Sequence, residues 1–435
     1  MKSRLLLLIL SMLLGCSQLR PMALAQGARS EKQMPANRSV ALTLAQALSH
    51  VFERNPELEV SELEIQAASA RVSQAALKPN PEIEAVAENL AIPVLGAGLF
   101  QYTESTLQIS QRLELGSKRP LRVRAAEKEV AVAAGQLEVK KVELIAATSQ
   151  AFADVLAEQE RVANQQELSR LAQQSHSIVV ERVAAGKVSP VEQTRARVAL
   201  AAAQVEEEKH LRALVAAKDR LAALWGGSHG DIDSVQGDFE IPPAASDIPE
   251  SCIHNNPDLK LAAAAVDSRD AALSLELAFR KPDLTFNAGF RRLSLENQDV
   301  WVAGVSIPLP VFDRRQGAIA EARVRLNQSR SAEQALERHL RAELTQARHD
   351  HEIALLEAKS LSESALPAAK EAAAAVKEGY RLGKFDFLNV LDAQRTYAEL
   401  QGRYIEAVAS GLKAATEIQR LARCDSPTIP PEPAK

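Results

Sequence analysis

Asn55-Pro56-Glu57-Leu58 and Asn256-Pro257-Asp258-Leu259 are two copies of one short pattern. Pro81-Glu82-Ile83 and Pro282-Asp283-Leu284 follow at the same offset, and Ala185-Gly186-Lys187 has a counterpart in Leu382-Gly383-Lys384. Self-similarity at a long spacing is the sequence signature of an internal repeat. The sequence therefore predicts one duplicated unit rather than a solenoid of many units.

The duplication places the same order of elements in both halves: helix, strand, strand, very long helix, tight turn and helix. We expect a first repeat over residues 42–225, a linker over 226–255 and a second repeat over 256–423, flanked by an N-terminal linker at 26–41 and a tail at 424–435. In the first repeat we expect strands at about 81–90 and 105–115, the long helix at about 117–185 and the turn at 186–190. In the second repeat we expect strands at about 282–292 and 301–311, the long helix at about 313–382 and the turn at 383–387.

The expected strands alternate strictly between apolar and polar residues. Leu107, Ile109 and Leu113 alternate with polar neighbours, and Trp301 opens a similar apolar series in the last strand. This period-two pattern is typical of a barrel with lipid outside and water inside. Four strands cannot close a barrel, and open edges cannot face lipid. Three copies would supply twelve strands, although closure alone does not exclude other copy numbers.

The long helices give the expected protomer its length. No proline lies between Pro120 and Pro190, so a helix over 117–185 would be roughly 100 Å long at 1.5 Å per residue. We expect a kink at Pro367 in its counterpart. The remaining helices, about 42–77, 190–225, 258–280 and 388–423, are about half as long, so two of them stacked end to end match one long helix.

The turns that follow the two long helices contain helix-capping signals. Ser189-Pro190-Val191-Glu192 predicts a capping box with proline at the first helical position. Asp386 is the candidate cap of the equivalent helix. Gly186 and Gly383 stand where a left-handed residue would end the descending helix.

The N-terminus indicates export. Lys2 and Arg4 precede an apolar run too short to span a membrane, which is typical of a signal peptide over residues 1–25. Ala23-Leu24-Ala25 is an ordinary cleavage site, whereas Leu13-Leu14-Gly15-Cys16 would direct cleavage before Cys16 and its lipidation. Both alternatives remain open.

Composition and motifs exclude several functions. The net charge is −4, so there is no basic footprint for nucleic acid. The chain has no phosphate loop and no nucleophile elbow, so an enzyme is not expected, and neither is a cofactor. His349-Asp350-His351 would point its two imidazoles apart on a helix, which makes a poor metal-ligand pair.

Together these features resemble the TolC family of outer-membrane efflux ducts, from about Leu42 to Arg420. Two stretches are similar to its CzcC-like heavy-metal branch: Ser110-Gln111-Arg112-Leu113-Glu114-Leu115-Gly116-Ser117-Lys118-Arg119 and the segment from Tyr380 to Arg395. The resemblance implies a mainly α protomer with four membrane strands. It also implies a homotrimer with a twelve-stranded barrel in the outer membrane of a Gram-negative bacterium, and a helical barrel in the periplasm.

The resemblance also implies partners and site residues. A periplasmic adapter (a membrane fusion protein) would dock on the tip, together with an inner-membrane pump of the RND type. Glu192 and Tyr380 match latch positions, Asp392 matches an acidic constriction position, and Asn389 stands where the family has a second carboxylate. Phe385 stands where the family has a latch arginine, so we expect the closed state to rest on packing. The residues expected to contact the adapter are Ala185, Gly186, Lys187, Leu382, Gly383 and Lys384.

The function expected from these features is a passive exit duct for divalent heavy-metal cations of the cobalt, zinc, cadmium or nickel type. A duct for drugs or for type I secretion is the alternative within the family. A periplasmic coiled-coil adapter or scaffold is the alternative from another class, although an adapter would need a compact β-rich domain interrupting its hairpin, and the sequence shows no such domain. Cys252 and Cys424 lie at similar heights in the expected fold, and we predict a disulfide between them.

Overall fold

The computed structural model describes residues 41–89, 103–242 and 248–423. Along the first repeat lie α2 (Leu44–Arg54), α3 (Pro56–Ala75), β1 (Glu82–Glu88), β2 (Glu104–Leu113), α4 (Lys118–Ala184) and α5 (Pro190–Ala223). The linker carries η1 (His229–Asp231) and η3 (Glu250–Asn255). The second repeat comprises α6 (Pro257–Ala278), β3 (Leu284–Leu293), β4 (Gln298–Ser306), α7 (Gln316–Ser360), the π-helical turn η4 (Leu361–Ala365), α8 (Leu366–Arg381) and α9 (Phe387–Leu421).

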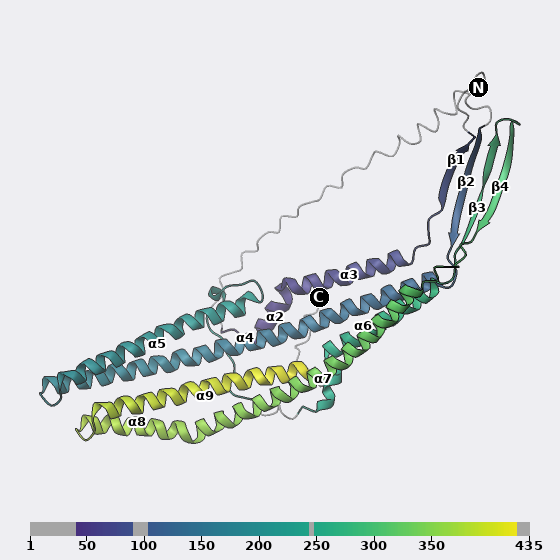
Figure 1. Ribbon diagram of the computed structural model, residues 1–435. Coiled ribbons are helices and arrows are strands. Elements are labelled where there is room, and N and C mark those ends of the chain that lie inside the picture. The colour runs from purple at the N-terminus through teal and green to yellow at the C-terminus, as the bar shows by residue number, and fades with distance from the viewer. Residues whose placement is uncertain (1–40, 90–102, 243–247, 424–435) are drawn as a thin grey trace, which may run out of the picture. The chain divides into compact units, whose positions relative to one another are not determined.

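The mainly helical, duplicated fold with four antiparallel strands is as predicted. Figure 1 shows the strands beyond the ends of α3 and α6 and the two tight turns at the opposite ends of α4 and α8. Near the strands the helices pack in the order α3, α4, α6 and α7, whereas near the turns the order is α5, α4, α9 and then α7 with α8. Helix α4 therefore packs against neighbours near the strands and near the turns. Helices α3 and α5 form one lateral edge of the helical part, and α7 and α8 form the other.

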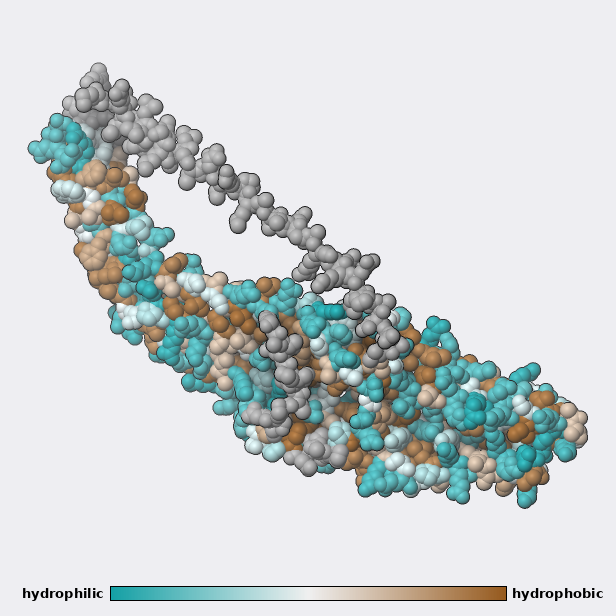
Figure 2. Space-filling view, turned by 180° about the vertical axis from the view of Figure 1, so that it is seen from behind, coloured by the Kyte–Doolittle hydropathy of each residue, from teal (hydrophilic) through white to brown (hydrophobic). Residues whose placement is uncertain are grey.

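The four strands pair in the order β1-β2-β3-β4. Their register aligns apolar residues in rows across the sheet: Ala85 faces Leu107, Leu107 faces Phe290 and Phe290 faces Trp301. Trp301 is 88% exposed, so this apolar face is left uncovered by the chain itself. Figure 2 shows hydrophobic side chains over the middle of the sheet and hydrophilic ones at its far end.

One strand is shorter than predicted, and the second long helix is interrupted next to the proline where a kink was expected. Strand β4 begins at Gln298 and ends at Ser306, so Ile307 and Leu309 lie beyond it, because Pro308 and Pro310 offer no N–H to a ladder. The second long helix is interrupted before Pro367 by the π-helical turn Leu361–Ala365. A proline removes one helical hydrogen bond, and a π turn absorbs such a mismatch in register.

The repeated Asn-Pro motif joins the half-length helices end to end. Asn55 accepts a hydrogen bond from Glu57 N at 2.8 Å and donates one to Leu224 O at the end of α5, also at 2.8 Å. Asn256 accepts from Asp258 N at 2.7 Å and donates to Leu421 O at the end of α9 at 3.1 Å. One side chain therefore caps the N-terminus of one helix and the C-terminus of the next.

The core lies around these joints. On the first side α2, α4, α5 and the linker enclose one apolar cluster, which includes Phe152, Leu221 and Trp225. On the second side Leu344, Ile418 and Leu421 pack with Ile253 of the linker. The linker segment is held by its backbone as well, since Leu42 N donates to Ser234 O and Gln236 N donates to Leu42 O, both at 2.9 Å. Among the described residues, no helix combines the length and the apolarity that a membrane crossing requires.

The joints make a stability prediction. Asn256→Ala removes a buried helix cap and leaves the carbonyl of Leu421 without its side-chain donor, so we expect a loss of about 1–2 kcal/mol. Asn55→Ala should cost a similar amount, and the two effects should add because the sites are separate. Thermal unfolding of the detergent-solubilised protein, followed by circular dichroism, measures both.

Asn327→Ala is the matched control, since Asn327 is exposed on α7 and should change stability by less than about 0.5 kcal/mol. Equal melting temperatures for all three variants and the wild type would show that the joints do not stabilise the fold.

Candidate functional site

The two tight turns, between α4 and α5 and between α8 and α9, have the same backbone conformation. Gly186 and Gly383 have positive φ of 68° and 78°. Lys187 N donates to Arg182 O at 2.9 Å, and Lys384 N donates to Gly379 O at 2.8 Å, closing the ends of α4 and α8. This is the Schellman arrangement, in which a left-handed glycine lets the next residue reach back to the helix end. Both predicted tip sequences therefore form equivalent turns.

The capping chemistry after each turn differs from the prediction. The Ser189 hydroxyl accepts from Val191 N at 3.3 Å, but the carboxylate of Glu192 does not close a capping box. Asp386 occupies the N-cap position of α9 without a side-chain cap bond. The local signal was correct for the position of each helix start, but tertiary contacts redirect the Glu192 side chain.

Those contacts centre on Tyr380, which is only 3% exposed. Its hydroxyl donates to Glu192 Oε2 at 2.9 Å, and its ring lies 5.5 Å from the ring of Phe387. Burial, together with the hydrogen bond to Glu192, raises the pKa of Tyr380, so the phenol stays protonated and remains a donor. Because Glu192 belongs to α5 and Tyr380 to α8, the bond joins the two helical hairpins.

Arg182 completes this cluster, and the sequence reasoning missed it. Its guanidinium lies 4.5 Å from the centre of the Tyr380 ring, and its Nη1 donates to the carbonyls of Tyr380 and Arg381 at the end of α8. A cation at a helix C-terminus that also stacks on an aromatic ring stabilises both. The only sequence signal was a basic residue in the last turn of α4, which is common at any helix end.

The remaining predicted tip residues are exposed, and Gly383 lies beside Arg182 of this cluster. Asn389 and Asp392 are exposed on α9 about one turn apart. Phe385, at the position of the family's latch arginine, packs on Gly379, where an added Cβ would lie 2.3 Å from the ring. Phe385 therefore packs locally within its own turn, and the arginine beside Tyr380 comes from α4 of the other hairpin.

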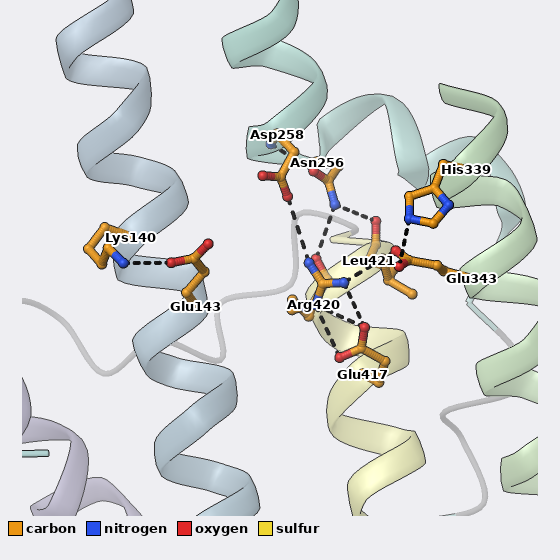
Figure 3. A network of polar contacts seen from close by, with 9 residues as sticks. All are labelled: Lys140, Glu143, Asn256, Asp258, His339, Glu343, Glu417, Arg420 and Leu421. Atoms are coloured by element: carbon orange, nitrogen blue, oxygen red, sulfur yellow. Dashed lines mark hydrogen bonds and ion pairs between the residues drawn. The ribbon is translucent and has the colours of Figure 1, made fainter. Parts of the chain in front are cut away.

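A second polar network surrounds the joint between α6 and α9 (Figure 3). Arg420 is its hub: its guanidinium lies 2.6 Å from Glu417, 3.5 Å from Glu343 and 3.7 Å from Asp258. Hydrogen bonding to Glu417 raises the pKa of Arg420, which therefore remains charged. His339 adds a contact at 3.1 Å to Glu343.

Asp258 is the poorly solvated member of this network. Burial raises the pKa of its carboxyl, the neighbouring Glu143 and Glu343 raise it further, and Arg420 opposes them. In the first repeat the equivalent Glu57 lies 3.3 Å from Lys140 of α4. Each joint thus places one acid beside one base, but the second joint holds more carboxylates than bases.

Neither network is a metal centre. In the parts of the chain that the structure describes, no group of three or more histidine, cysteine, aspartate or glutamate side chains is placed to hold a metal ion. Cys252 packs against the second core cluster and takes part in a disulfide bond. Cys16 and Cys424 lie outside the described residues, so the pairing with Cys424 and the lipidation of Cys16 stay predictions.

Comparison with known proteins identifies what this architecture is. The outer membrane efflux protein family matches residues 47–227 and 248–422, which cover both repeats. The chain belongs to the outer membrane efflux protein family. It is therefore a component of an efflux channel in the outer membrane, with a helical extension into the periplasm, and not an enzyme.

Relatives and solved structures agree with the family. The chain is 32% identical over 389 residues to the cobalt-zinc-cadmium resistance protein CzcC of Cupriavidus metallidurans, covering 89% of this chain and 91% of that one. It is 26% identical over 267 residues to the nickel-cobalt-cadmium resistance protein NccC of Alcaligenes xylosoxydans xylosoxydans, covering 61% and 60% of the two chains. The fold matches crystal structures of CusC with a TM-score of 0.76 and 16% sequence identity, and the match covers 90% of this chain and 95% of that one. It also matches the crystal structure of a membrane protein from Pseudomonas aeruginosa with a TM-score of 0.75 and 20% sequence identity, covering 87% of this chain and 90% of that one.

The raised pKa of Asp258 makes a prediction about pH. The folded protein holds this proton more tightly than the unfolded chain, so the contribution of Asp258 to stability falls as pH rises above the ordinary carboxyl range. Asp258→Asn removes the charge, and the variant should therefore gain in melting temperature over the wild type as pH rises to neutrality. The gain should disappear in acid, where the wild-type carboxyl is protonated.

Asp267→Asn is the control, because it removes the same charge from a largely exposed position of α6 where Lys128 is the ion-pair partner. An Asp258→Asn variant that melts below the wild type at neutral pH would show that the contact with Arg420 outweighs the cost of burial.

Proposed function

We propose that three copies of this chain form an outer-membrane exit channel for divalent heavy-metal cations. The observation that carries the choice of substrate is the similarity to CzcC, a cobalt-zinc-cadmium resistance protein, over about nine-tenths of both chains. The names of two further relatives also refer to nickel and cobalt resistance. Similarity to structures such as the outer-membrane channel OprN supports only the fold, so a drug duct is the less favoured alternative.

Unpaired strand edges and exposed apolar residues along the sides of the protomer support the proposed trimer. Strands β1 and β4 each have one unpaired edge within the described sheet, and such edges require a partner in lipid. The edge helices also expose apolar residues. Val191, Val198 and Val205 recur every seven residues on α5, and Ile353 and Leu356 on α7 are 62% and 74% exposed. Stripes at this spacing suit helix packing between neighbouring copies, with one edge of each protomer against the other edge of the next.

The tip is the proposed docking and gating end. The turns Ala185-Gly186-Lys187 and Leu382-Gly383-Lys384 would meet a periplasmic adapter, which links the channel to an inner-membrane pump. The cluster of Arg182, Glu192 and Tyr380 would hold the hairpins together in the closed state. Three copies of Asp392 would form one acidic ring near the tip, and Asn389 would add a polar ring beside it.

A deletion strain tests the substrate. Loss of the gene should lower tolerance to zinc, cobalt, cadmium or nickel, and plasmid-borne wild-type protein should restore it. Growth at graded metal and drug concentrations, with cellular metal measured by mass spectrometry, gives the readout. Unchanged metal tolerance with reduced drug tolerance would overturn the metal assignment and favour the drug duct.

Conductance tests the proposed latch. Tyr380→Phe removes one hydrogen bond but keeps the ring, so we expect a modest rise in single-channel conductance in planar bilayers. Arg182→Gln removes both the ring contact and the bonds to the end of α8, and the rise should be larger. Glu192→Gln keeps a hydrogen-bond acceptor and should have the smallest effect.

Tyr397→Phe is the control, since the Tyr397 hydroxyl accepts a hydrogen bond from Gln401 Nε2 of the same helix at 2.8 Å. Wild-type conductance in both the Tyr380→Phe and the Arg182→Gln channels would exclude the cluster as a latch.

A further inference from the structure

The first of the two CzcC-like stretches builds a cavity that the proposed function leaves without a role. A cavity of about 690 Å³ lies where the sheet meets the helices, and Arg112 and Lys118 of that stretch are among the residues that line it. Gly116 of the same stretch contacts another lining residue, since an added Cβ would lie 2.7 Å from Lys281 Cδ. The positive φ of 77° at Gly116 makes this close approach available to glycine in particular.

The cavity opens on the polar face of the sheet. Glu82 is paired with Ser110, and Arg112 with Thr285, and all four line the cavity. Their neighbours along the strands, such as Ile83 and Phe286, carry the opposite, apolar face. Whatever enters the cavity therefore approaches from the side that faces water in a closed barrel.

The balance of charge in the cavity is positive, and its acids are largely engaged. The carboxylate of Asp283 lies 2.6 Å from Lys118 Nζ and accepts from Leu115 N at 3.0 Å. The carboxylate of Asp313 accepts from Arg315 N at 2.8 Å. The lining bases are Arg112, Lys118, Arg280, Lys281 and Arg315, against the acids Glu82, Asp283 and Asp313.

Three of the bases are exposed and available to a ligand. Arg315 is held by Glu276 at 2.7 Å, and Lys118 is 4% exposed and held by Asp283. Arg112, Arg280 and Lys281 are exposed around the cavity. Arg280 and Lys281 follow the end of α6, where cations complement the helix dipole, but Arg112 lies on a strand and has no such structural reason.

Two helix N-termini add to the positive field. Helix α4 begins at Lys118 and α7 at Gln316, and both are preceded by a left-handed N-cap residue without a side-chain cap bond. The first N–H groups of these helices are therefore not satisfied by a capping side chain. Guanidinium groups and uncapped helix N-termini are the donors that phosphate-like oxyanions prefer.

We propose that this junction cavity binds a small oxyanion, with inorganic phosphate as the probe, and that it thereby sets the charge preference of the channel at the base of the barrel. The proposal about selectivity rests on the channel function proposed above, whereas binding itself does not.

The test compares two double variants. Arg112→Gln with Lys281→Gln removes two exposed cavity charges, while Arg119→Gln with Arg314→Gln removes two exposed charges nearby that do not line the cavity. Calorimetric titration of the detergent-solubilised protein with phosphate should show binding that the first pair weakens by at least about tenfold and the second pair leaves unchanged. Equal weakening by both pairs, or no heat of binding to the wild type, would overturn the proposal.

Bilayer recordings test the consequence and separate it from the channel function. In a salt gradient, the reversal potential of the Arg112→Gln, Lys281→Gln channel should shift toward cation preference relative to both the wild type and the control pair. An unshifted potential would overturn the role in selectivity. If the wild type forms no channels at all, the proposed function fails while the phosphate titration still decides whether the cavity binds. A phosphate effect seen only when anionic phospholipid is present in the bilayer would assign the site to a lipid headgroup and also overturn the proposal.

Discussion

The joint between half-length helices is the constraint on which the rest of this structure depends. A helix end exposes backbone groups that need partners, and each joint brings together the last carbonyls of one helix and the first N–H groups of the next. Asn55 and Asn256 satisfy donors on one side and an acceptor on the other with a single amide. Because each joint is fixed, α3 with α5 and α6 with α9 run alongside continuous partners, and the strands and the turns are kept at opposite ends.

The same constraint explains where charge can be tolerated. Near the joint of α6 and α9, the partly buried Arg420 is shared among Asp258, Glu343 and Glu417. At the tip, the buried Tyr380 meets a carboxylate and a guanidinium that come from the other hairpin. The tip cluster therefore couples the two hairpins, whereas the Arg420 network couples α6, α7 and α9 within the second repeat.

Much of this architecture could be predicted from sequence because it is set by local and periodic signals. The duplicated motifs, the strand alternation and the proline-free runs determine which segments are helices and strands. The positions of Gly186 and Gly383 in the sequence predicted where the two tight turns lie. Tertiary contacts could not be predicted in the same way. Glu192 was assigned to a capping box by a four-residue pattern, but the hydroxyl of Tyr380, distant in sequence, competes for its carboxylate. Arg182 gave no distinguishing signal, because its role exists only once α8 ends beside it.

The first CzcC-like stretch lies between β2 and α4, and the second lies at the turn between α8 and α9. One forms the junction of β2 with α4, where Gly116 brings Lys281 against the turn, and the other forms the turn between α8 and α9, where Gly379 admits the ring of Phe385. At both places a glycine allows one large side chain to pack closely: Lys281 lies against Gly116, and Phe385 lies against Gly379. Charged residues of the cavity and of the tip cluster lie next to these contacts.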